Sequence, residues 1–255
     1  MTRQTSSGPF SERIIEMRKL AVLSSRISSV VLRNWLRSDQ RRAGNFVVLG
    51  FPKSGTTWVS QIIAEACGFD YRRDRVRVQL SNVLLHTHSI NFVGTSNLIY
   101  VVRDPREAIC SAARAIPPDR RSEAFDANGK IRFDFVVMAI ERLPGATTSY
   151  VNHLTTCQEK GWRFVRFEDL KMDTVGTMAK VIALGDRPVE QEQVTEAVNK
   201  FDFNMLKKES NGDRFLAQSS LASWQDLLSQ EALELVAERL AEPAAAFGYD
   251  LEPVA

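Results

Sequence analysis

The stretch from Phe46 to Trp58, which reads FVVLGFPKSGTTW, carries the residue types of an anion-binding loop. Residues 46–50 are apolar or small, and such a run is typical of a buried parallel strand. A turn rich in Pro, Ser and Gly follows, and the residues from Thr56 onward have helical periodicity. A strand, a glycine turn and a helix N-terminus direct backbone amides and the positive end of the helix dipole at one spot. The sequence therefore predicts a cradle for an anion.

The spacing within this loop differs from that of the nucleotide loop G-x-x-x-x-G-K-[ST], in which lysine follows the second glycine. Gly50 and Gly55 keep the glycine spacing, but the next residue is Thr and the lysine stands earlier, at Lys53. The segment PKSGTTW resembles the 5′-phosphosulfate loop of the cytosolic-type sulfotransferases, which use the donor 3′-phosphoadenosine 5′-phosphosulfate (PAPS). The resemblance implies that the donor is bound by Lys53, Ser54, Gly55, Thr56 and Thr57.

A second motif begins with Arg103, which ends an apolar strand, and includes Ser111, eight residues later. The planar guanidinium of arginine can bind a phosphate through two parallel hydrogen bonds. The spacing resembles the 3′-phosphate motif of the same family, and the resemblance assigns both residues to that group of PAPS. A Walker-type kinase needs an acidic residue at such a strand end to hold magnesium. Here Asp104 is expected to cap the next helix instead, and the family's transfer implies no metal.

Two histidines are candidates for the catalytic base. His88 ends the segment Leu85-His86-Thr87-His88, which resembles the Lys-Thr-His segment that carries the family's base, with His86 in place of the lysine. Histidine suits proton abstraction because its ordinary pKa lies near neutrality. We expect His88 to be the base, while the substitution at position 86 leaves His86 as the alternative.

The adenine of the donor is expected to bind between two aromatic side chains, since bases stack on aromatic rings. Trp58 resembles the family's stacking tryptophan, and Phe203 resembles the opposing wall. One departure concerns the 3′-phosphate pocket: where many members carry Arg-Lys before a tryptophan, this chain has Ala217 and Gln218 ahead of Trp224. Basic residues that could substitute are Lys207, Lys208 and Arg214.

Two further segments match the family without carrying chemistry. His153 resembles a helix position that we interpret as structural. Residues 167–170 resemble a strand-to-helix junction, and no catalytic role is assigned to them.

These motifs require alternating strands and helices. Strands are predicted at 46–50, 83–87, 97–102 and 162–167. Helices are predicted at 56–67, from Asp104–Pro105 to about 115, at 133–160 with a break at Pro144–Gly145, from an Asp169 or Asp173 cap to about 184, and at 229–247. A surface connection is predicted at 70–79 and a polar loop at 122–130. This alternation predicts an α/β fold, and the resemblance implies a three-layer P-loop-type domain with a central parallel sheet flanked by helices.

Composition bounds the partners and the compartment. A net charge of +2 over 255 residues is too small to indicate nucleic acid binding. Three widely spaced cysteines and the absence of a recognisable signal peptide favour a cytoplasmic setting. Residues 1–44 are predicted to be a basic amphipathic helical segment, and 45–255 the sulfotransferase domain. Residues 11–42 carry eight basic and three acidic residues, which suits either a helix packed on the domain or peripheral contact with an anionic membrane.

The sequence thus predicts a sulfotransferase that moves a sulfuryl group from PAPS to a hydroxyl, less readily an amine, of a small-molecule, lipid or carbohydrate acceptor. Lys53 is expected to stabilise the leaving phosphate. The alternatives are a small-molecule kinase on the same loop architecture and a non-catalytic nucleotide-binding module. The acceptor pocket is expected to use the irregular segments 67–85, 115–133 and 211–223.

Overall fold

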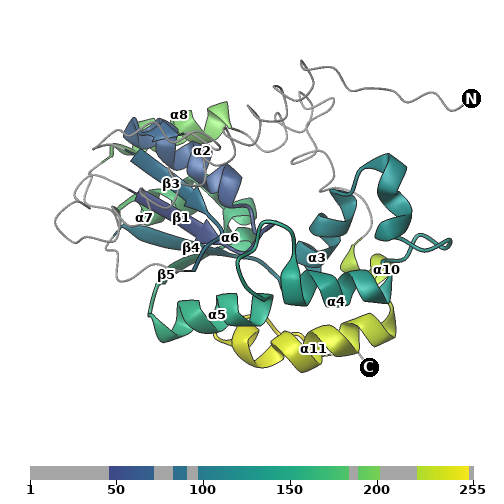
Figure 1. The fold of residues 1–255 in the computed structure, drawn as a ribbon. Helices are drawn as coiled ribbons and strands as arrows, with labels where there is room; N and C mark the ends of the chain where they lie inside the picture. Colours follow the sequence, from purple (N-terminus) through teal and green to yellow (C-terminus); the bar gives the residue numbers. More distant parts are fainter. Residues whose placement is uncertain (1–45, 72–82, 91–96, 184–188, 202–222, 253–255) are drawn as a thin grey trace, which may run out of the picture.

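The computed structural model describes residues 46–71, 83–90, 97–183, 189–201 and 223–252. Within these ranges five parallel strands form one sheet in the order β2-β3-β1-β4-β5 (Figure 1). The strands are β1 (Phe46–Gly50), β2 (Asp70–Tyr71), β3 (Val83–Thr87), β4 (Leu98–Val102) and β5 (Arg163–Arg166). All four predicted strands are confirmed within a residue at each end. The expected connection from residue 70 is wrong at its start, because Asp70 and Tyr71 pair with β3.

Ten helical elements accompany the sheet in the part of the chain that the structure describes. They are α2 (Thr56–Cys67), α3 (Pro105–Arg114), the 3-10 helix η2 (Pro118–Glu123), α4 (Phe133–Arg142), α5 (Tyr150–Glu159), α6 (Phe167–Met172), α7 (Thr174–Ala183), α8 (Gln191–Lys200), α10 (Trp224–Leu227) and α11 (Gln230–Ala245).

The sheet separates two hydrophobic cores, and successive residues of β1 enter them alternately, as the pleat of a strand requires. Val47 and Leu49 pack with residues of α3, α4, α5 and α11. Phe46 and Val48 pack on the opposite face with residues of α2, α7 and α8. Figure 1 shows α2 and α8 above the sheet and α4, α5 and α11 below it. The predicted three-layer α/β architecture is therefore confirmed, and β1 is buried on both faces.

The helix ends follow local chemistry. Asp104 caps α3, because its carboxylate accepts a 2.8 Å hydrogen bond from the Arg106 amide, and Gly68 ends α2 with φ 64°; both were predicted. Of the two proposed caps for the helix after β5, Asp173 is correct, since it accepts from the Gly176 amide at 2.8 Å. Asp169 is not a cap, because α6 begins directly after β5 and contains it.

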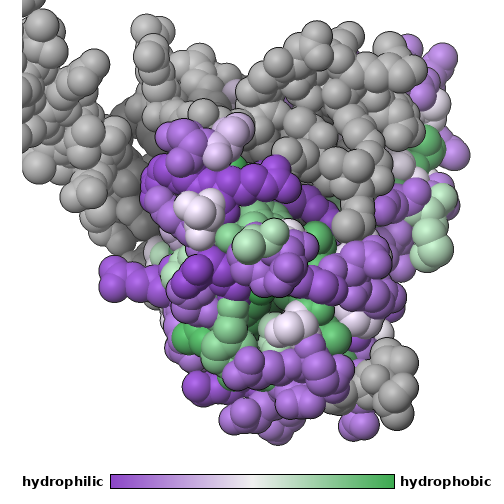
Figure 2. All heavy atoms as spheres, turned by 90° about the vertical axis from the view of Figure 1, so that its right-hand side faces the viewer, coloured by the Kyte–Doolittle hydropathy of each residue, from purple (hydrophilic) through white to green (hydrophobic). Residues whose placement is uncertain are grey.

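Two segments differ from the expectations. Helix α8 is missing from the predicted elements, although its buried residues Val194, Ala197 and Val198 follow the i, i+3, i+4 spacing of an amphipathic helix. The expected polar loop at 122–130 contains an anchor: Phe125, which is buried, forms an antiparallel bridge with the buried Ile131. Figure 2 shows the face that lies at the right in Figure 1, where hydrophilic side chains predominate and hydrophobic ones occupy smaller areas between them.

The predicted N-terminal segment 1–44 lies outside the described residues, so the division into 1–44 and 45–255 stays a prediction, as does membrane contact through 11–42. Among the helices that the structure describes, none combines the length and the apolar character needed to cross a membrane.

Candidate active site

The predicted site residues that the structure describes lie at or near the carboxyl edge of the sheet. β1 leads into the loop that contains Lys53, β3 into His88, β4 into Arg103 and β5 into Phe167. β1 lies between β3 and β4, and the chain leaves it towards β2 on one side and later crosses to β4 on the other. A sheet of this kind binds ligands outside the carboxyl ends of its strands, at the point where the strand order reverses.

The loop after β1 is held in a tight conformation by its neighbours. Lys53 has φ 74°, and among the described residues it is the one non-glycine residue with a positive φ, a region that costs L-residues energy. A Cβ atom at Gly50 would lie 2.5 Å from the Val101 carbonyl oxygen. A Cβ atom at Gly55, which has φ 94°, would lie 2.4 Å from Phe167. Both glycines are therefore required for the loop to pack between β4 and Phe167.

The loop offers donors that suit an anion. Ser54 is 1% exposed, and its hydroxyl lies close to the Tyr150 hydroxyl. Helix α2, which begins with Thr56 and Thr57, has no side-chain cap and no acidic residue in its first turn. Its positive end and N-terminal amides are therefore not capped by a side chain or by a first-turn carboxylate of α2 itself. These features fit a phosphate or sulfate group at this loop.

Arg103 connects the second motif to the loop. Its Nη1–H donates to the Lys53 carbonyl at 3.1 Å, and its Nη2 lies 3.3 Å from Glu107 Oε2. The guanidinium carbon lies 4.5 Å from the centre of the Phe167 ring. Arg103 is 9% exposed, and its Nε has no hydrogen-bond partner within the described residues. Ser111 is partly exposed on α3, one turn beyond Glu107 on the same face.

The two candidate bases bracket the loop. The His88 Nδ1 lies 2.7 Å from the Gly50 carbonyl, where β1 ends. The His86 Nε2 lies 2.8 Å from the Thr56 hydroxyl, where α2 begins. Because a carbonyl only accepts, His88 must carry its proton on Nδ1, and the lone pair of the neutral ring is on Nε2. This tautomer gives His88 the form that a general base needs.

Trp58 is 4% exposed and donates its indole N–H to the Phe201 carbonyl at 2.8 Å. Its ring meets Phe167 edge to face, with centroids 6.0 Å apart. Phe201 is the C-cap of α8 and the last described residue before a gap at 202–222, so the predicted adenine wall Phe203 lies outside the described residues. The same holds for Ala217, Gln218 and the basic residues that could substitute for the missing pair, Lys207, Lys208 and Arg214.

Asp104, the acidic residue that follows β4, is fully engaged. In addition to capping α3, its Oδ2 accepts a 2.8 Å hydrogen bond from Arg106 Nη2. A carboxylate committed to a helix cap and an ion pair is not arranged as the magnesium ligand of a Walker-type kinase.

Some residues of the site are absent from the sequence-based prediction. Tyr150 on α5 donates its hydroxyl hydrogen bond to the Arg103 carbonyl at 3.0 Å, and nothing in the sequence indicates this distant contact. Glu107 pairs with Arg103 at i and i+4, a spacing that is visible once α3 is placed. The loop between α4 and α5 lies beside His88, because Thr147 donates to the His88 carbonyl at 3.4 Å and a Cβ atom at Gly145 would lie 4.0 Å from the His88 ring. This loop is outside the segments expected to line the acceptor pocket.

His153 lies behind the site and is fully buried. Its ring meets Phe51 edge to face at 5.2 Å, and its Nδ1 lies 3.5 Å from the Tyr100 hydroxyl. Burial and, to a smaller extent, the nearby His88 lower the pKa of His153 to about 4. The ring is therefore neutral at physiological pH, which agrees with its interpretation as structural.

Comparisons with known proteins agree with this geometry. Rat sulfotransferase 2A2 is 19% identical over 239 residues, which cover 76% of this chain and 77% of the relative. Mouse sulfotransferase SULT7A1 complexed with PAP superposes with a TM-score of 0.60 at 16% identity, over 82% of this chain and 89% of that chain. Retinol dehydratase in a complex with retinol and PAP gives a TM-score of 0.57 at 14% identity, over 82% of this chain and 83% of that chain. These structures share the fold.

The family model described as the sulfotransferase domain matches residues 85–247. The matched span contains His86, His88, Arg103 and Ser111 and begins after the loop at 50–57. It covers more than half of the chain, and the chain therefore belongs to the sulfotransferase domain family.

Proposed function

We propose that this protein transfers a sulfuryl group from PAPS to a hydroxyl group of a small-molecule acceptor. The observation that carries the proposal is that one loop is hydrogen-bonded by the residues of both neighbouring motifs. Arg103 donates to the Lys53 carbonyl, and His88 donates to the Gly50 carbonyl. Donor recognition and proton transfer are thereby assigned to opposite sides of one anion cradle.

The loop residues would hold the 5′-phosphosulfate end of the donor. The amides at the start of α2 and the hydroxyls of Ser54, Thr56 and Thr57 donate hydrogen bonds to its oxygens, and PAPS supplies the sulfuryl group when bound. Lys53 stabilises the negative charge that grows on the phosphate oxygen as the S–O bond breaks. Preorganised donors of this kind supply much of the rate in such transfers. Arg103 and Ser111 bind the 3′-phosphate, and Trp58 and Phe203 enclose the adenine.

His88 acts on the acceptor. Its Nε2 takes the proton of the acceptor hydroxyl while the acceptor oxygen bonds to sulfur, and the phosphate oxygen of the donor leaves. The Nδ1–H bond to Gly50 holds the ring in the tautomer required for this step and stabilises the imidazolium that forms. His86 remains the alternative base, although its Nε2 is directed at Thr56 rather than at the acceptor side of the loop.

The acceptor is proposed to be a small molecule with a hydroxyl group. Support comes from solved structures of retinol dehydratase, which are complexes with androsterone and with retinol. The loop 143–149 beside His88 would contribute to the acceptor pocket. A cytoplasmic location is proposed as well, because Cys67, Cys110 and Cys157 are all free thiols.

Calorimetry with adenosine 3′,5′-bisphosphate (PAP, the product that remains when PAPS has lost its sulfuryl group), and with ATP and magnesium, tests the donor assignment. Incubation with labelled PAPS and a panel of hydroxyl acceptors tests the reaction. Binding of PAP and acceptor-dependent transfer of label would support the proposal. Binding of ATP with magnesium in preference to PAP would favour the kinase alternative. Binding of PAP without transfer to any class of acceptor would favour the non-catalytic module.

A further inference from the structure

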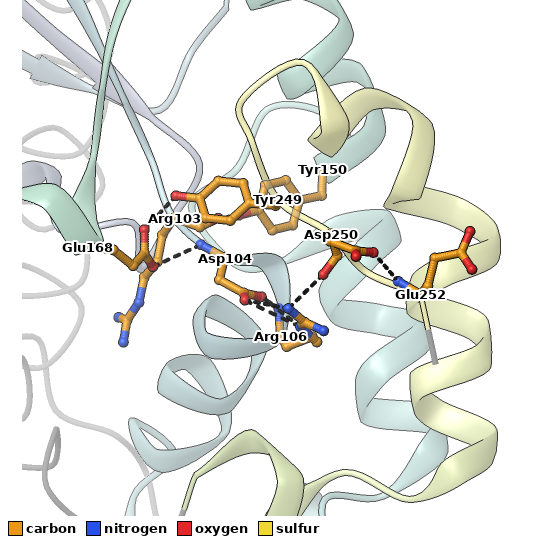
Figure 3. A network of polar contacts seen from close by, with 8 residues as sticks. All are labelled: Arg103, Asp104, Arg106, Tyr150, Glu168, Tyr249, Asp250 and Glu252. Carbon is orange, nitrogen blue, oxygen red and sulfur yellow. Dashed lines mark hydrogen bonds and ion pairs between the residues drawn. The ribbon is translucent and has the colours of Figure 1, made fainter. Parts of the chain in front are cut away.

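The peptide unit between Arg103 and Asp104 is held on both sides by side chains from distant parts of the chain (Figure 3). Its carbonyl accepts a 3.0 Å hydrogen bond from the Tyr150 hydroxyl on α5. Its N–H donates a 3.1 Å hydrogen bond to Glu168 Oε1 on α6. Both polar groups of a single peptide are therefore fixed by side chains just where Arg103 leaves the strand end.

Tyr150 is itself rigid. Its side chain is fully buried, and its ring stacks on Phe51 with centroids 4.0 Å apart and planes inclined by 8°. Phe51 directly precedes the loop residues Pro52 and Lys53. Burial raises the pKa of Tyr150 well above its ordinary value, so the hydroxyl stays protonated and donates. One aromatic side chain thus contacts the backbone next to both motifs of the site.

Glu168 is held from the other side by the C-terminal segment. Its Oε2 accepts a 2.5 Å hydrogen bond from the Tyr249 hydroxyl, and the guanidinium of Arg166 lies 4.7 Å from the centre of the Tyr249 ring. Arg106 ties the same segment to Asp104, because it bonds both the Asp104 carboxylate and the Asp250 carbonyl. The residues after α11 therefore brace the peptide through Glu168.

We propose that Tyr150 and Glu168 are positioning residues that aim the Arg103 guanidinium at the 3′-phosphate of the donor. The inference rests on the proposed function, in which Arg103 binds that group. With the peptide fixed, the guanidinium keeps one orientation between the Lys53 carbonyl, Glu107 and Phe167. The Arg103 side chain therefore loses little conformational entropy when the donor binds. Without either support the peptide can rotate and the arginine loses its direction, which lowers the selectivity for a nucleotide with a 3′-phosphate.

The test compares the affinities for PAP and for adenosine 5′-monophosphate, which lacks the 3′-phosphate, by calorimetry on the full chain. Tyr150→Phe keeps the ring stacked on Phe51 and removes the hydrogen bond, so PAP should bind about five- to tenfold more weakly, with the monophosphate changed less than about twofold. Glu168→Met, which removes the acceptor for the Asp104 amide, should have the same selective effect. Glu168→Gln keeps an acceptor oxygen and should restore the selectivity.

Two controls separate positioning from general stability. Tyr71→Phe removes a hydroxyl from β2 at an edge of the sheet and should leave the ratio of the two affinities unchanged. In an Arg103→Ala background, Tyr150→Phe should have no further effect on that ratio, because its effect acts through the arginine. Thermal melting identifies variants that fail to fold. Glu168→Gln and Tyr150→Phe nearly preserve the shape of the side chain, so both variants should fold and their nucleotide affinities can be compared directly.

The outcomes distinguish the two levels of the argument. A wild-type protein that binds both nucleotides equally would contradict the proposed donor. A wild-type protein that prefers PAP, with the preference kept in Tyr150→Phe and Glu168→Met, would overturn the positioning role while leaving the donor assignment intact. Variants that bind both nucleotides more weakly by the same factor would also overturn the positioning role, because a merely structural role predicts that result.

Discussion

The Nδ1–H of His88 donates a 2.7 Å hydrogen bond to the carbonyl of Gly50, the last residue of β1. This contact fixes a tautomer and a position together. The proton sits on Nδ1, the lone pair on Nε2, and the ring is attached to the residue from which the anion-binding loop departs. The candidate base is therefore tied to the start of the loop, and a change at Gly50 should displace His88.

Lys53 is expected to act on the leaving group for every acceptor. Lys53→Ala should lower the transfer rate by roughly 10²–10³-fold, as expected for the loss of one preorganised donor. Because Lys53 has φ 74°, Lys53→Gly should be about 1 kcal/mol more stable than Lys53→Ala and equally slow. Rates with labelled PAPS and urea unfolding of both variants check this. Full activity in Lys53→Gly would show that the amine is not needed.

Gly50 should not tolerate a side chain. In Gly50→Ala the new Cβ would lie 2.5 Å from the Val101 carbonyl oxygen, and the paired backbones of β1 and β4 would have to separate. Overpacking of this kind should cost about 1–3 kcal/mol in the free energy of unfolding, and PAP affinity should fall with it. Gly68→Ala is the matched control: its φ is 64° and its Cβ would meet nothing within 4 Å. It should lose about 1 kcal/mol of stability and keep its PAP affinity. Equal PAP affinities in both variants would contradict the packing argument.

His153 should make the fold sensitive to acid. Its pKa is lowered to about 4 by burial, below the ordinary 6.5, so the neutral ring favours the folded state above about pH 6.5, and that stability is lost as the pH falls towards 4. Between about pH 7.5 and pH 5 the free energy of unfolding should drop by about 2 kcal/mol more in the wild type than in His153→Gln. Urea unfolding at the two pH values measures the difference. The same drop in both proteins would assign the acid sensitivity to other groups.

The sequence predicts much of this arrangement because its signals are local. The strand at 46–50, the Asp104 cap and the spacing of Arg103 and Ser111 each depend on neighbouring residues, and parallel strands bring their carboxyl ends together at one edge. The contacts of Tyr150 and Glu168 with the Arg103–Asp104 peptide span 47 and 64 residues, and no periodicity encodes them. Histidine tautomers are equally invisible in a sequence, since the carbonyl that selects Nδ1 on His88 comes from another strand.

The role of His88 can be isolated with two variants. His88→Asn places an amide N–H where Nδ1 donates and so keeps the bond to Gly50, but it has no counterpart of Nε2. His86→Gln is the matched control, because the amide nitrogen of glutamine can replace Nε2 in the contact with Thr56. PAP affinity should change less than about twofold in either variant, since neither loses a contact made with the loop.

The most direct test of the account is the rate of PAP formation from PAPS by His88→Asn, relative to the wild type, across hydroxyl acceptors of decreasing pKa. With an alcohol the variant should be slower by roughly 10²–10⁴-fold, because the acceptor proton has no base. With an acidic phenol, which is already partly ionised, the loss should shrink, and His86→Gln should show no such trend. If His88→Asn retained the wild-type rate on alcohols, or if the trend appeared in His86→Gln instead, His88 would not be the base and the account would be contradicted.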